Sequence, residues 1–369
     1  MKLIFDLLAF ERGKSYGFEE YISNILTYVV DHRQEIAADR IIIACLDTQV
    51  KYFESLCDNK IEIFGISARN MINRFLKSRI IPKLLKASEE DVIFYPGNYM
   101  PYFSSSKAKK ILVIHDLLFR HSKFCSKKIA FSLLRLQRYL YVPKSLKEAN
   151  KVIAISNYTH KEIIDTYNIS RNKVTTIYNY FNFDKYNDNS KRTISDISGD
   201  YFLSVCSKEK HKNHIVLLKA FEHIAIDDKE IKFVLVGSLN PDVLDIWNSW
   251  DDELRNRFII VKHISNSDFY YLYTHAKAYI SASKYEGLGM PVVEALYFGL
   301  NSFLSDIEIH REVSFNSAQY FNCDDWKELA NLMKHPVSNK SVRNLVEERY
   351  SALNTSDKYC KVFNEILNA

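Results

Sequence analysis

The 369-residue chain contains few cysteines, and their spacing suits neither a zinc site nor a disulfide framework. The six cysteines, among them Cys45, Cys206 and Cys360, lie far apart and form no C-x-x-C pair. Zinc domains and small disulfide-stapled domains need closely spaced cysteines. We therefore expect free thiols in a reducing compartment.

The sequence also lacks an export signal and a membrane-spanning stretch. Its first ten residues carry Asp6 and no small-residue cleavage site, so they predict a strand and not a signal peptide. No apolar run approaches the roughly 20 residues that a spanning helix needs. We expect a cytoplasmic protein that is at most peripheral at the inner face of the cytoplasmic membrane.

Acidic residues are scarce in two parts of the first half, although the formal net charge is only +5. Residues 107–151 contain twelve Lys or Arg and two acids, and residues 71–87 contain five basic residues and no acid. Apolar residues are interspersed in both, as in segments that meet anionic lipid. An anionic membrane surface is therefore one expected partner, and a solvated basic helix face is the competing interpretation. No nucleic-acid motif accompanies the charge, so we expect no nucleic-acid partner.

The chain is too long for one typical hydrophobic core, and its pattern predicts two α/β domains. Short, β-branched apolar runs alternate with helix-like segments, as in parallel sheets covered on both faces. A polar, turn-rich stretch interrupts this series, and the series then restarts. We expect an N-terminal domain over 1–183, a linker over 184–198 and a second domain over 199–344. A C-terminal helix over 345–369 can then cross back to the first domain.

The predicted strands fall into two sets, one in each domain. They are 2–5, 40–45, 60–64, 91–95, 110–114, 151–155 and 174–177, followed by 201–205, 233–236, 258–261, 278–280 and 302–304. Both domains are thus expected to be Rossmann-like, with ligands at the carboxyl ends of the strands. A cleft between the two domains is the predicted active site.

The stretch 282–299 organises the chemistry of the second domain. It holds two glutamates, Glu286 and Glu294, separated by a segment that begins Gly287, Leu288, Gly289, Met290, Pro291. This pattern predicts a tight glycine loop running into a helix, whose N-terminal N–H groups attract phosphate. Glu294, one turn inside the helix, can accept two hydrogen bonds from a diol. The combination suits a nucleotide sugar.

Several motifs in a fixed order resemble the family 4 retaining glycosyltransferases of the GT-B fold, including bacterial O-antigen and polysaccharide mannosyltransferases. In the second half these are 201–221, 233–238, 267–276, the E-x7-E stretch with its internal G-x-G-x-P, and 305–313. In the first half they are the dipeptide His115-Asp116, the triplet 154–156 and the stretch 177–184. The resemblance covers nearly the whole chain and implies a GT-B fold with two Rossmann-like domains. The domain over 1–183 is then expected to be the acceptor-side domain, and the domain over 199–344 to bind the nucleotide sugar.

The resemblance implies a role for each residue of the donor site in the second domain. Glu294 is expected to hold the ribose hydroxyls, and Glu286 to face the donor sugar and phosphates. The backbone from Gly287 to Met290 is expected to contact sugar and phosphate oxygens. Lys212 matches a lysine that binds the diphosphate, but Cys206 replaces the usual glycine and Ser207 stands near where many members have arginine. Lys208 or His211 is the expected source of the missing charge.

In the first domain the resemblance places His115 against the donor sugar. This histidine follows the predicted strand 110–114, so it belongs at a strand's carboxyl end. Asp116 can orient the histidine or order the loop, and Gly17 matches a glycine-containing loop near the reacting groups. Local turn chemistry explains Asp116 and Gly17 equally well, and a buried structural histidine is the competing interpretation of His115.

No metal and no other cofactor is expected. Transferases of the other common fold hold a metal with a D-x-D triplet, and this chain contains none. Lys212 and the loop from Gly287 to Met290 are the expected substitute, because they can stabilise the charge that develops on the leaving diphosphate. In the enzymes that the chain resembles, the leaving phosphate itself is thought to take the acceptor proton.

These features predict a retaining hexosyltransferase that acts on a lipid-linked or surface polysaccharide glycan. GDP-mannose is the first expectation for the donor and a UDP-sugar the second. A GT-B-fold sugar-nucleotide epimerase is one alternative, although it would not predict the combination of Lys212 with E-x7-E. The other alternative is a non-catalytic homologue that binds a glycan or a partner transferase. The departures at Cys206 and Ser207 from the family pattern of the diphosphate site make this alternative conceivable.

Overall fold

The computed structural model divides into two compact units, which are described separately here. Unit 1 comprises Met1–Arg120, Lys127–Asn182 and Arg349–Ala369, and unit 2 comprises His121–Ser126 and Phe183–Glu348. The structure describes residues 1–13, 16–57, 60–68, 70–101, 106–124, 129–187, 194, 197, 199–262, 264–338 and 340–369. Much of the predicted linker over 184–198 therefore lies outside the described residues.

Unit 1 contains a parallel sheet of seven strands in the order β3-β2-β1-β4-β5-β6-β7. The central strands are buried on both faces, which explains why they appear in the sequence as nearly continuous apolar runs. β3 begins two residues later than predicted. The strands are β1 (Lys2–Asp6), β2 (Arg40–Leu46), β3 (Glu62–Ile66), β4 (Val92–Tyr95), β5 (Lys109–Ile114), β6 (Lys151–Ala154) and β7 (Val174–Thr176).

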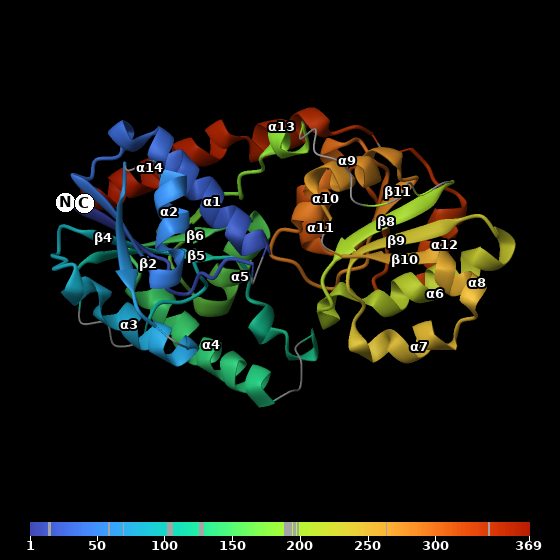
Figure 1. Cartoon of the computed structure of the whole chain (residues 1–369), viewed down its shortest axis with the longest axis horizontal. Helices are drawn as coiled ribbons and strands as arrows, with labels where there is room; N and C mark the ends of the chain where they lie inside the picture. Colours follow the sequence, from blue (N-terminus) through green and yellow to red (C-terminus); the bar gives the residue numbers. More distant parts are fainter. Residues whose placement is uncertain are drawn as a thin grey trace. The chain divides into compact units, whose positions relative to one another are not determined.

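Helices cover both faces of this sheet (Figure 1). One face carries α1 and α14, whose Phe363 ring packs against Phe5 and Phe94 of the strands. The other face carries α3, α4 and α5, and their Ile81, Val142 and Ile163 share one core with the strands. The helices of unit 1 are α1 (Tyr16–Asp31), α2 (Val50–Cys57), α3 (Met71–Leu84), α4 (Ile129–Glu148), α5 (Asn157–Tyr167) and α14 (Ala352–Leu367).

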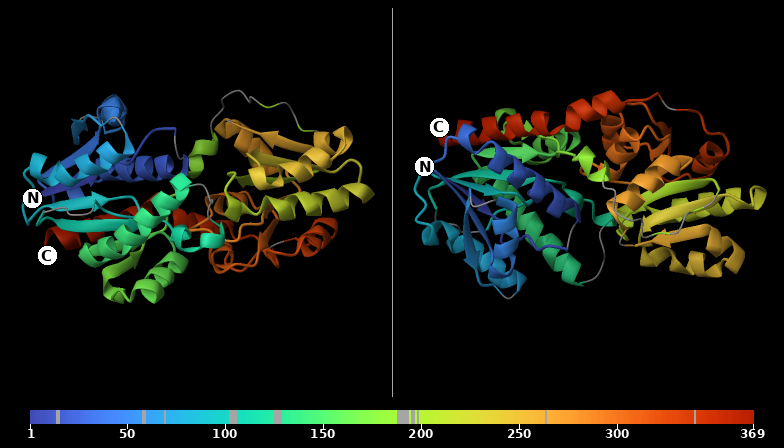
Figure 2. Two further views of the ribbon diagram at one scale, coloured as in Figure 1. Left: turned by 90° about the horizontal axis from the view of Figure 1, so that it is seen from below. Right: turned by 45° about the horizontal axis from the view of Figure 1, so that its top comes forward.

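The C-terminal helix α14 is an integral part of unit 1. The hydroxyls of Tyr21 and Tyr359 are hydrogen bonded at 2.7 Å, and Lys151 Nζ lies 2.9 Å from Glu365 Oε1. The backbone N–H of Ala37 donates to Asn364 Oδ1 at 2.8 Å. The last helix of the chain therefore packs on the domain that contains the first strand, and the two chain ends lie close together (Figure 2).

Unit 2 contains a second parallel sheet, with six strands in the order β10-β9-β8-β11-β12-β13. Two parallel α/β units confirm the predicted fold class. β13 was not predicted, because it has only three residues and only Phe321 of these is buried. The strands are β8 (Tyr201–Cys206), β9 (Lys232–Gly237), β10 (Phe258–Val261), β11 (Ala278–Ser281), β12 (Ser302–Ser305) and β13 (Gln319–Phe321).

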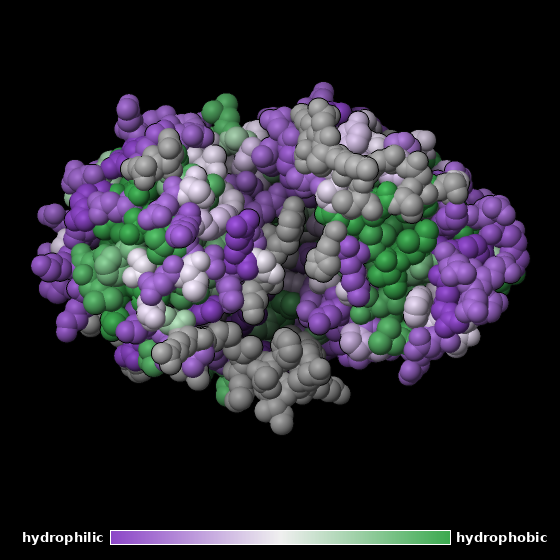
Figure 3. Space-filling model, viewed as in Figure 1, coloured by the Kyte–Doolittle hydropathy of each residue, from purple (hydrophilic) through white to green (hydrophobic). Residues whose placement is uncertain are grey.

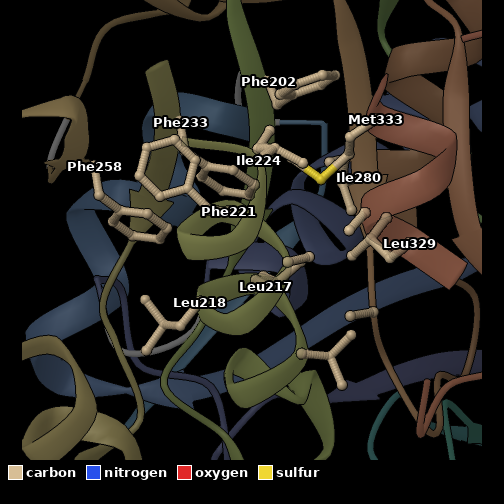
Figure 4. Packing of buried hydrophobic residues seen from close by; sticks show 14 of the residues in the cluster. Phe202, Leu217, Leu218, Phe221, Ile224, Phe233, Phe258, Ile280, Leu329 and Met333 are labelled. Carbon is tan, nitrogen blue, oxygen red and sulfur yellow. The ribbon is translucent and has the colours of Figure 1, made fainter. Parts of the chain in front are cut away.

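The core of unit 2 is rich in aromatic side chains (Figure 4). Phe233 and Phe258 stack with their ring centroids 4.8 Å apart, and Phe221 of α6 packs edge-on against both. α6 thereby rests on β9 and β10. The helices are α6 (His214–Asp227), α7 (Leu244–Ser249), α8 (Asp252–Arg257), α9 (Asn266–His275), α10 (Met290–Tyr297), α11 (Glu308–Val313), α12 (Trp326–Lys334) and α13 (Arg343–Tyr350), which ends in unit 1.

Two short 3-10 helices of unit 2 bear on the site. η6 (Phe183–Asn187) falls within the stretch predicted as linker and packs against α9 and α10. Its Phe183 ring stacks on Tyr297 at 4.2 Å, and Tyr186 packs against Phe298 at 5.1 Å. η7 (Lys210–Lys212) follows β8 and carries Lys212.

Candidate functional site

The E-x7-E stretch forms a loop after β11 that leads directly into α10. Gly289 occupies the N-cap position with φ +83°, a left-handed conformation that side-chain-bearing residues rarely adopt. Pro291 lies in the first turn, where its missing N–H costs nothing. The N–H of Val292 donates to the carbonyl of Gly289 at 2.9 Å, and anion binding by this helix N-terminus stays a prediction.

Glu286 and Lys212 form a nearly buried ion pair at the start of this loop. Lys212 Nζ lies 2.5 Å from Glu286 Oε1, and Ser283 Oγ donates to the same oxygen at 2.6 Å. Burial by itself would raise the pKa of Glu286, but Lys212 and His211 outweigh it and lower that pKa to about 2. Near neutral pH Glu286 is therefore a carboxylate in this structure.

The turn that carries Lys212 is fastened to the same loop. The backbone N–H of Lys284 donates to the carbonyl of His211 at 2.7 Å, and the His211 side chain is buried. Asn213 takes the N-cap position of α6 without capping it, since its amide donates instead to the carbonyl of Cys323 at 2.6 Å. Lys212 and Glu286, 74 positions apart in sequence, are thus brought together as the motif analysis predicts.

Ser207 and Lys208 lie in the segment between β8 and η7. Both side chains are exposed, and the carbonyl of Lys208 accepts a hydrogen bond from Asn240 Nδ2 at 2.7 Å. Exposed side chains next to η7 have the freedom to meet a diphosphate. Their predicted role in donor binding stays a prediction.

Glu294 lies in α10 and is only 6% exposed. Its Oε2 accepts a hydrogen bond from the hydroxyl of Tyr273 in α9 at 2.6 Å. Its Oε1 is ion-paired with Lys185 of η6 at 3.3 Å. Two side chains distant in sequence therefore fix the orientation of this carboxylate.

Cys206, which stands where the resembling enzymes have glycine, is paired with a histidine. Its Sγ lies 3.1 Å from His214 Nε2. Burial raises the pKa of the Cys206 thiol to about 11, while burial and the neighbouring Lys212 and His211 lower the pKa of His214 to about 4. Near neutral pH both groups are therefore uncharged, and they share one hydrogen bond.

His115 lies in unit 1, directly after β5, and its ring is fixed. Its Nε2 lies 2.7 Å from the carbonyl of Pro96, which can only accept, so Nε2 carries the proton. Burial lowers the pKa of His115, although this carbonyl and Asp116 oppose the shift. The Tyr21 ring packs edge-on against the imidazole at 4.7 Å. The ring is a neutral tautomer with Nδ1 as its acceptor.

The two further candidates of unit 1 lie in the loop after β5 and in the first turn of α1, and their predicted roles stay predictions. Asp116 Oδ1 accepts from the backbone N–H of Leu118 at 2.9 Å, so Asp116 orders the loop after β5. Gly17 is the second residue of α1 and has no positive φ. Gly13 instead adopts φ +78°, and its N–H donates to Glu19 Oε2 at 2.8 Å.

The structure adds residues that the motif analysis missed. Tyr273 and Lys185 hold Glu294, and Ser283 holds Glu286. Ser283 stands three positions before Glu286, so the sequence itself indicates that these two residues lie close together. Tyr273 and Lys185 belong to no spacing pattern with Glu294, and only the packing of η6 and α9 reveals them.

Two parallel α/β units with a lysine-paired E-x7-E loop are the architecture of a GT-B glycosyltransferase. Family comparison agrees over most of the chain. Residues 187–351 match "Glycosyl transferases group 1", and residues 26–185 match "Glycosyltransferase Family 4". The chain belongs to the family 4 glycosyltransferases.

Known proteins resemble it along its length. The O-antigen chain mannosyltransferase RfbU of Salmonella typhimurium is 26% identical over 345 residues, which cover 88% of each chain. The structure of a glycosyltransferase from Rickettsia africae superposes with a TM-score of 0.69 at 18% identity and covers 99% of this chain and 98% of its own. The structure of Anabaena Alr3699/HepE in complex with UDP superposes with a TM-score of 0.67 at 15% identity and covers 99% of this chain and 100% of its own. These structural likenesses establish the fold.

Proposed function

We propose that the protein is a retaining hexosyltransferase that moves mannose from GDP-mannose onto a growing O-antigen-type glycan. The observation that carries this proposal is the ion pair of Lys212 and Glu286 beside the glycine loop of α10. The choice of mannose and of an O-antigen acceptor rests on the similarity to RfbU. A UDP-sugar is the second candidate donor, because Alr3699/HepE was crystallised with UDP.

The charges of this loop suit a diphosphate leaving group. Glu286 neutralises Lys212, and the ion pair keeps the lysine oriented and nearly buried. A diphosphate can share the ammonium and take further hydrogen bonds from the N-terminus of α10. The neighbouring Lys208 and His211 would add charge where other members use arginine. Departure of the diphosphate is then stabilised without a D-x-D metal site, so we propose a metal-independent reaction.

Glu294 of unit 2 and His115 of unit 1 have separate proposed roles. The Glu294 carboxylate, oriented by Tyr273 and Lys185, has the geometry to accept hydrogen bonds from ribose hydroxyls. In unit 1, the neutral His115 can accept a hydroxyl hydrogen of a sugar at Nδ1, since its Nε2–H donates to the carbonyl of Pro96. Retention is proposed to follow from return of the acceptor on the face that the diphosphate leaves, with a phosphate oxygen as the base. No protein base is then required.

A donor panel tests this function. Purified protein is incubated with GDP-mannose, UDP-glucose and UDP-N-acetylglucosamine, with and without EDTA, and both hydrolysis and transfer are followed. We expect turnover of GDP-mannose that EDTA leaves unchanged and an α-linked product by NMR. Glu294→Ala and Lys212→Ala should remove turnover, and Lys210→Met, on the same turn but exposed, should keep it. The transferase proposal fails if the wild type neither binds nor consumes a nucleotide sugar.

The epimerase alternative predicts a different product in the same assay. An epimerase would convert a UDP-sugar to its epimer without releasing UDP, whereas a transferase releases free nucleotide. A non-catalytic homologue would bind a glycan and release nothing. The family assignment favours the transferase.

We further propose that the enzyme works at the cytoplasmic face of the membrane, where a lipid-linked acceptor is accessible. No helix among the described residues is both long and apolar enough to cross a bilayer. The proposed location therefore depends on a surface that binds lipid peripherally.

A further inference from the structure

Exposed apolar side chains concentrate on two helices of unit 1. Among the described residues, thirteen large apolar side chains are exposed, and six of them lie on α3 and α4. The others are scattered singly over the chain, as on any soluble protein. Figure 3 shows a few hydrophobic residues among hydrophilic ones on part of the lower edge of unit 1, near where Figure 1 draws α3.

The exposed residues of α3 form a row along one side of the helix. Leu76, Ile80 and Leu84 follow at intervals of four residues and are 46%, 38% and 47% exposed. Residues at this spacing lie one above the other on a helix. Ile81, next to Ile80, is fully buried in the sheet core. α3 therefore packs apolar side chains on the sheet and carries a second, exposed apolar row on another side.

α4 repeats this arrangement. Leu136, Tyr139 and Leu140 are 55%, 36% and 60% exposed and lie one turn apart or adjacent on the helix. Val142 and Leu146 of the same helix are buried in the core that Ile81 of α3 also joins. Because both helices cover the same face of the sheet, their outward rows look to the same side of unit 1.

Basic side chains alternate with the exposed leucines. Lys77 and Lys83 are exposed directly beside Leu76 and Leu84, and α3 contains no acid. α4 contains four basic residues, Arg135, Arg138, Lys144 and Lys147, and a single acid at its last residue, Glu148. The surface formed by these two rows, here called the α3–α4 face, is therefore both apolar and positively charged.

Exposed leucines interleaved with lysines favour a bilayer over a protein as the partner of the α3–α4 face. The core of a protein interface is depleted in lysine, because an ammonium loses its hydration there. At a bilayer surface, leucine can enter the acyl boundary while the neighbouring lysine reaches back to an anionic headgroup. Lysines interleaved with exposed leucines fit the second situation.

We propose that the α3–α4 face is a docking surface for an anionic bilayer. Leu76, Ile80, Leu84, Leu136 and Leu140 enter the headgroup boundary, and the surrounding Lys and Arg side chains bind lipid phosphates. The lipid-bound acceptor then reaches the enzyme by diffusion in the plane of the membrane. This last step rests on the proposed function, whereas the docking itself does not.

Vesicle co-sedimentation of the full chain tests the proposal without any substrate. Vesicles of phosphatidylglycerol with phosphatidylcholine are compared with vesicles of phosphatidylcholine alone. The wild type should bind the anionic vesicles, and binding should weaken with salt. Leu76→Ser with Leu84→Ser should lower the partition coefficient roughly tenfold. Lys77→Gln with Lys83→Gln should lower it by about fivefold for each charge.

Matched changes in unit 2 provide the controls. Ile226 and Val337 are 64% and 65% exposed, so Ile226→Ser with Val337→Ser removes similar apolar surface elsewhere. Lys229→Gln with Lys340→Gln removes the same charge from exposed positions. Both control proteins should bind vesicles like the wild type, and all four variants should keep the wild-type melting temperature.

Three outcomes would overturn the proposal. One is equal binding of the leucine variant and the wild type, and another is an equal loss in the control variants. The third is a dimer in vesicle-free gel filtration that Leu76→Ser with Leu84→Ser converts to a monomer, because the row would then be an interface between two copies. Since vesicle binding needs no nucleotide sugar, failure of docking is distinguishable from failure of the transferase assay.

Discussion

Lys185 Nζ lies 3.3 Å from Glu294 Oε1, and both side chains are nearly buried. The lysine belongs to η6, the first structured segment of unit 2 after Asn182, whereas the glutamate belongs to α10. The Phe183 ring of η6 stacks on Tyr297 of α10, and Tyr186 packs against Phe298, the residue that follows α10. The start of unit 2 is thus held against the residue proposed to bind the ribose.

Lys185→Met should weaken nucleotide binding because the Glu294 carboxylate loses a charged partner and its fixed orientation. A charged hydrogen bond of this kind contributes enough for a roughly tenfold or larger rise in Kd. Isothermal titration calorimetry with GDP and with 2′-deoxy-GDP would measure this rise in Kd. In Lys185→Met the preference for GDP over 2′-deoxy-GDP should disappear. Lys185→Arg is the matched control and should keep most of the affinity. An unchanged preference in Lys185→Met would show that the pair has no part in ribose binding.

Lys212→Met should slow the transfer step by about 100-fold or more, as expected when a group that stabilises transition-state charge is removed. The effect should fall mainly on kcat, measured with saturating donor. Lys210→Met is the control, because Lys210 lies on the same 3-10 helix but its ammonium is exposed and 3.9 Å from Asp242. Similar losses in both variants would indicate a general effect of charge and not of the Glu286 pair.

The lowered pKa of Glu286 predicts a contribution to folding stability that is lost in acid. Its pKa in the folded chain is about 2, below the ordinary value of 4.5, because Lys212 and His211 outweigh the effect of burial. The folded state therefore binds its proton less readily than the unfolded chain. This stabilisation is present above about pH 4.5 and is lost as the pH falls towards 2.

Thermal unfolding between pH 7 and pH 3 would check this dependence. Glu286→Gln should melt lower than the wild type at pH 7, and the difference should shrink as the pH falls. Glu253→Gln, at an exposed position, should show no such convergence. A difference that stays constant with pH would contradict the assigned charge state.

The lowered pKa of His115 predicts that folding stability also depends on pH at higher values than those at which Glu286 acts. Burial lowers the pKa of His115 below its ordinary 6.5, so the folded chain keeps the ring neutral while the unfolded chain becomes protonated. Stability from this site is thus present above pH 6.5 and decreases as the pH falls below it. His115→Asn should remove part of this slope in melting temperature, and His275→Asn, at an exposed position, should not. An unchanged slope in His115→Asn would refute the prediction.

Gly237 should be intolerant of a side chain. It adopts φ +132°, and a Cβ there would lie 1.9 Å from the carbonyl oxygen of Cys206. Gly237→Ala should lower the free energy of unfolding by roughly 2–4 kcal/mol, measured by urea denaturation. Gly97→Ala is the control, since a Cβ there meets no atom within 4 Å. Equal stability of the two variants would contradict the predicted clash.

Much of the candidate site could be predicted because its signals are local. The glycine loop, Pro291 and Glu294 stand in one short stretch, and backbone geometry at Gly289 follows from the residue itself. His115 could be placed because it follows a buried strand. Ser283 lies three residues from Glu286, although no motif singled it out.

Other contacts could not be predicted because they join distant segments. Lys185 is 109 positions from Glu294, and Tyr273 is 21 positions away on another helix. No periodicity connects such positions. β13 was missed because a three-residue edge strand with one buried side chain has no apolar run to mark it.

By itself, the sequence determined two parallel α/β units and the family to which they belong, because strands buried on both faces and a glycine loop before a helix leave local patterns. It also identified the basic segments of unit 1. The tertiary structure decided which partners hold Glu286 and Glu294, and that the leucines of α3 and α4 face outward while Ile81 and Val142 face the sheet. These features depend on how elements pack, and packing brings together residues that no spacing along the chain relates.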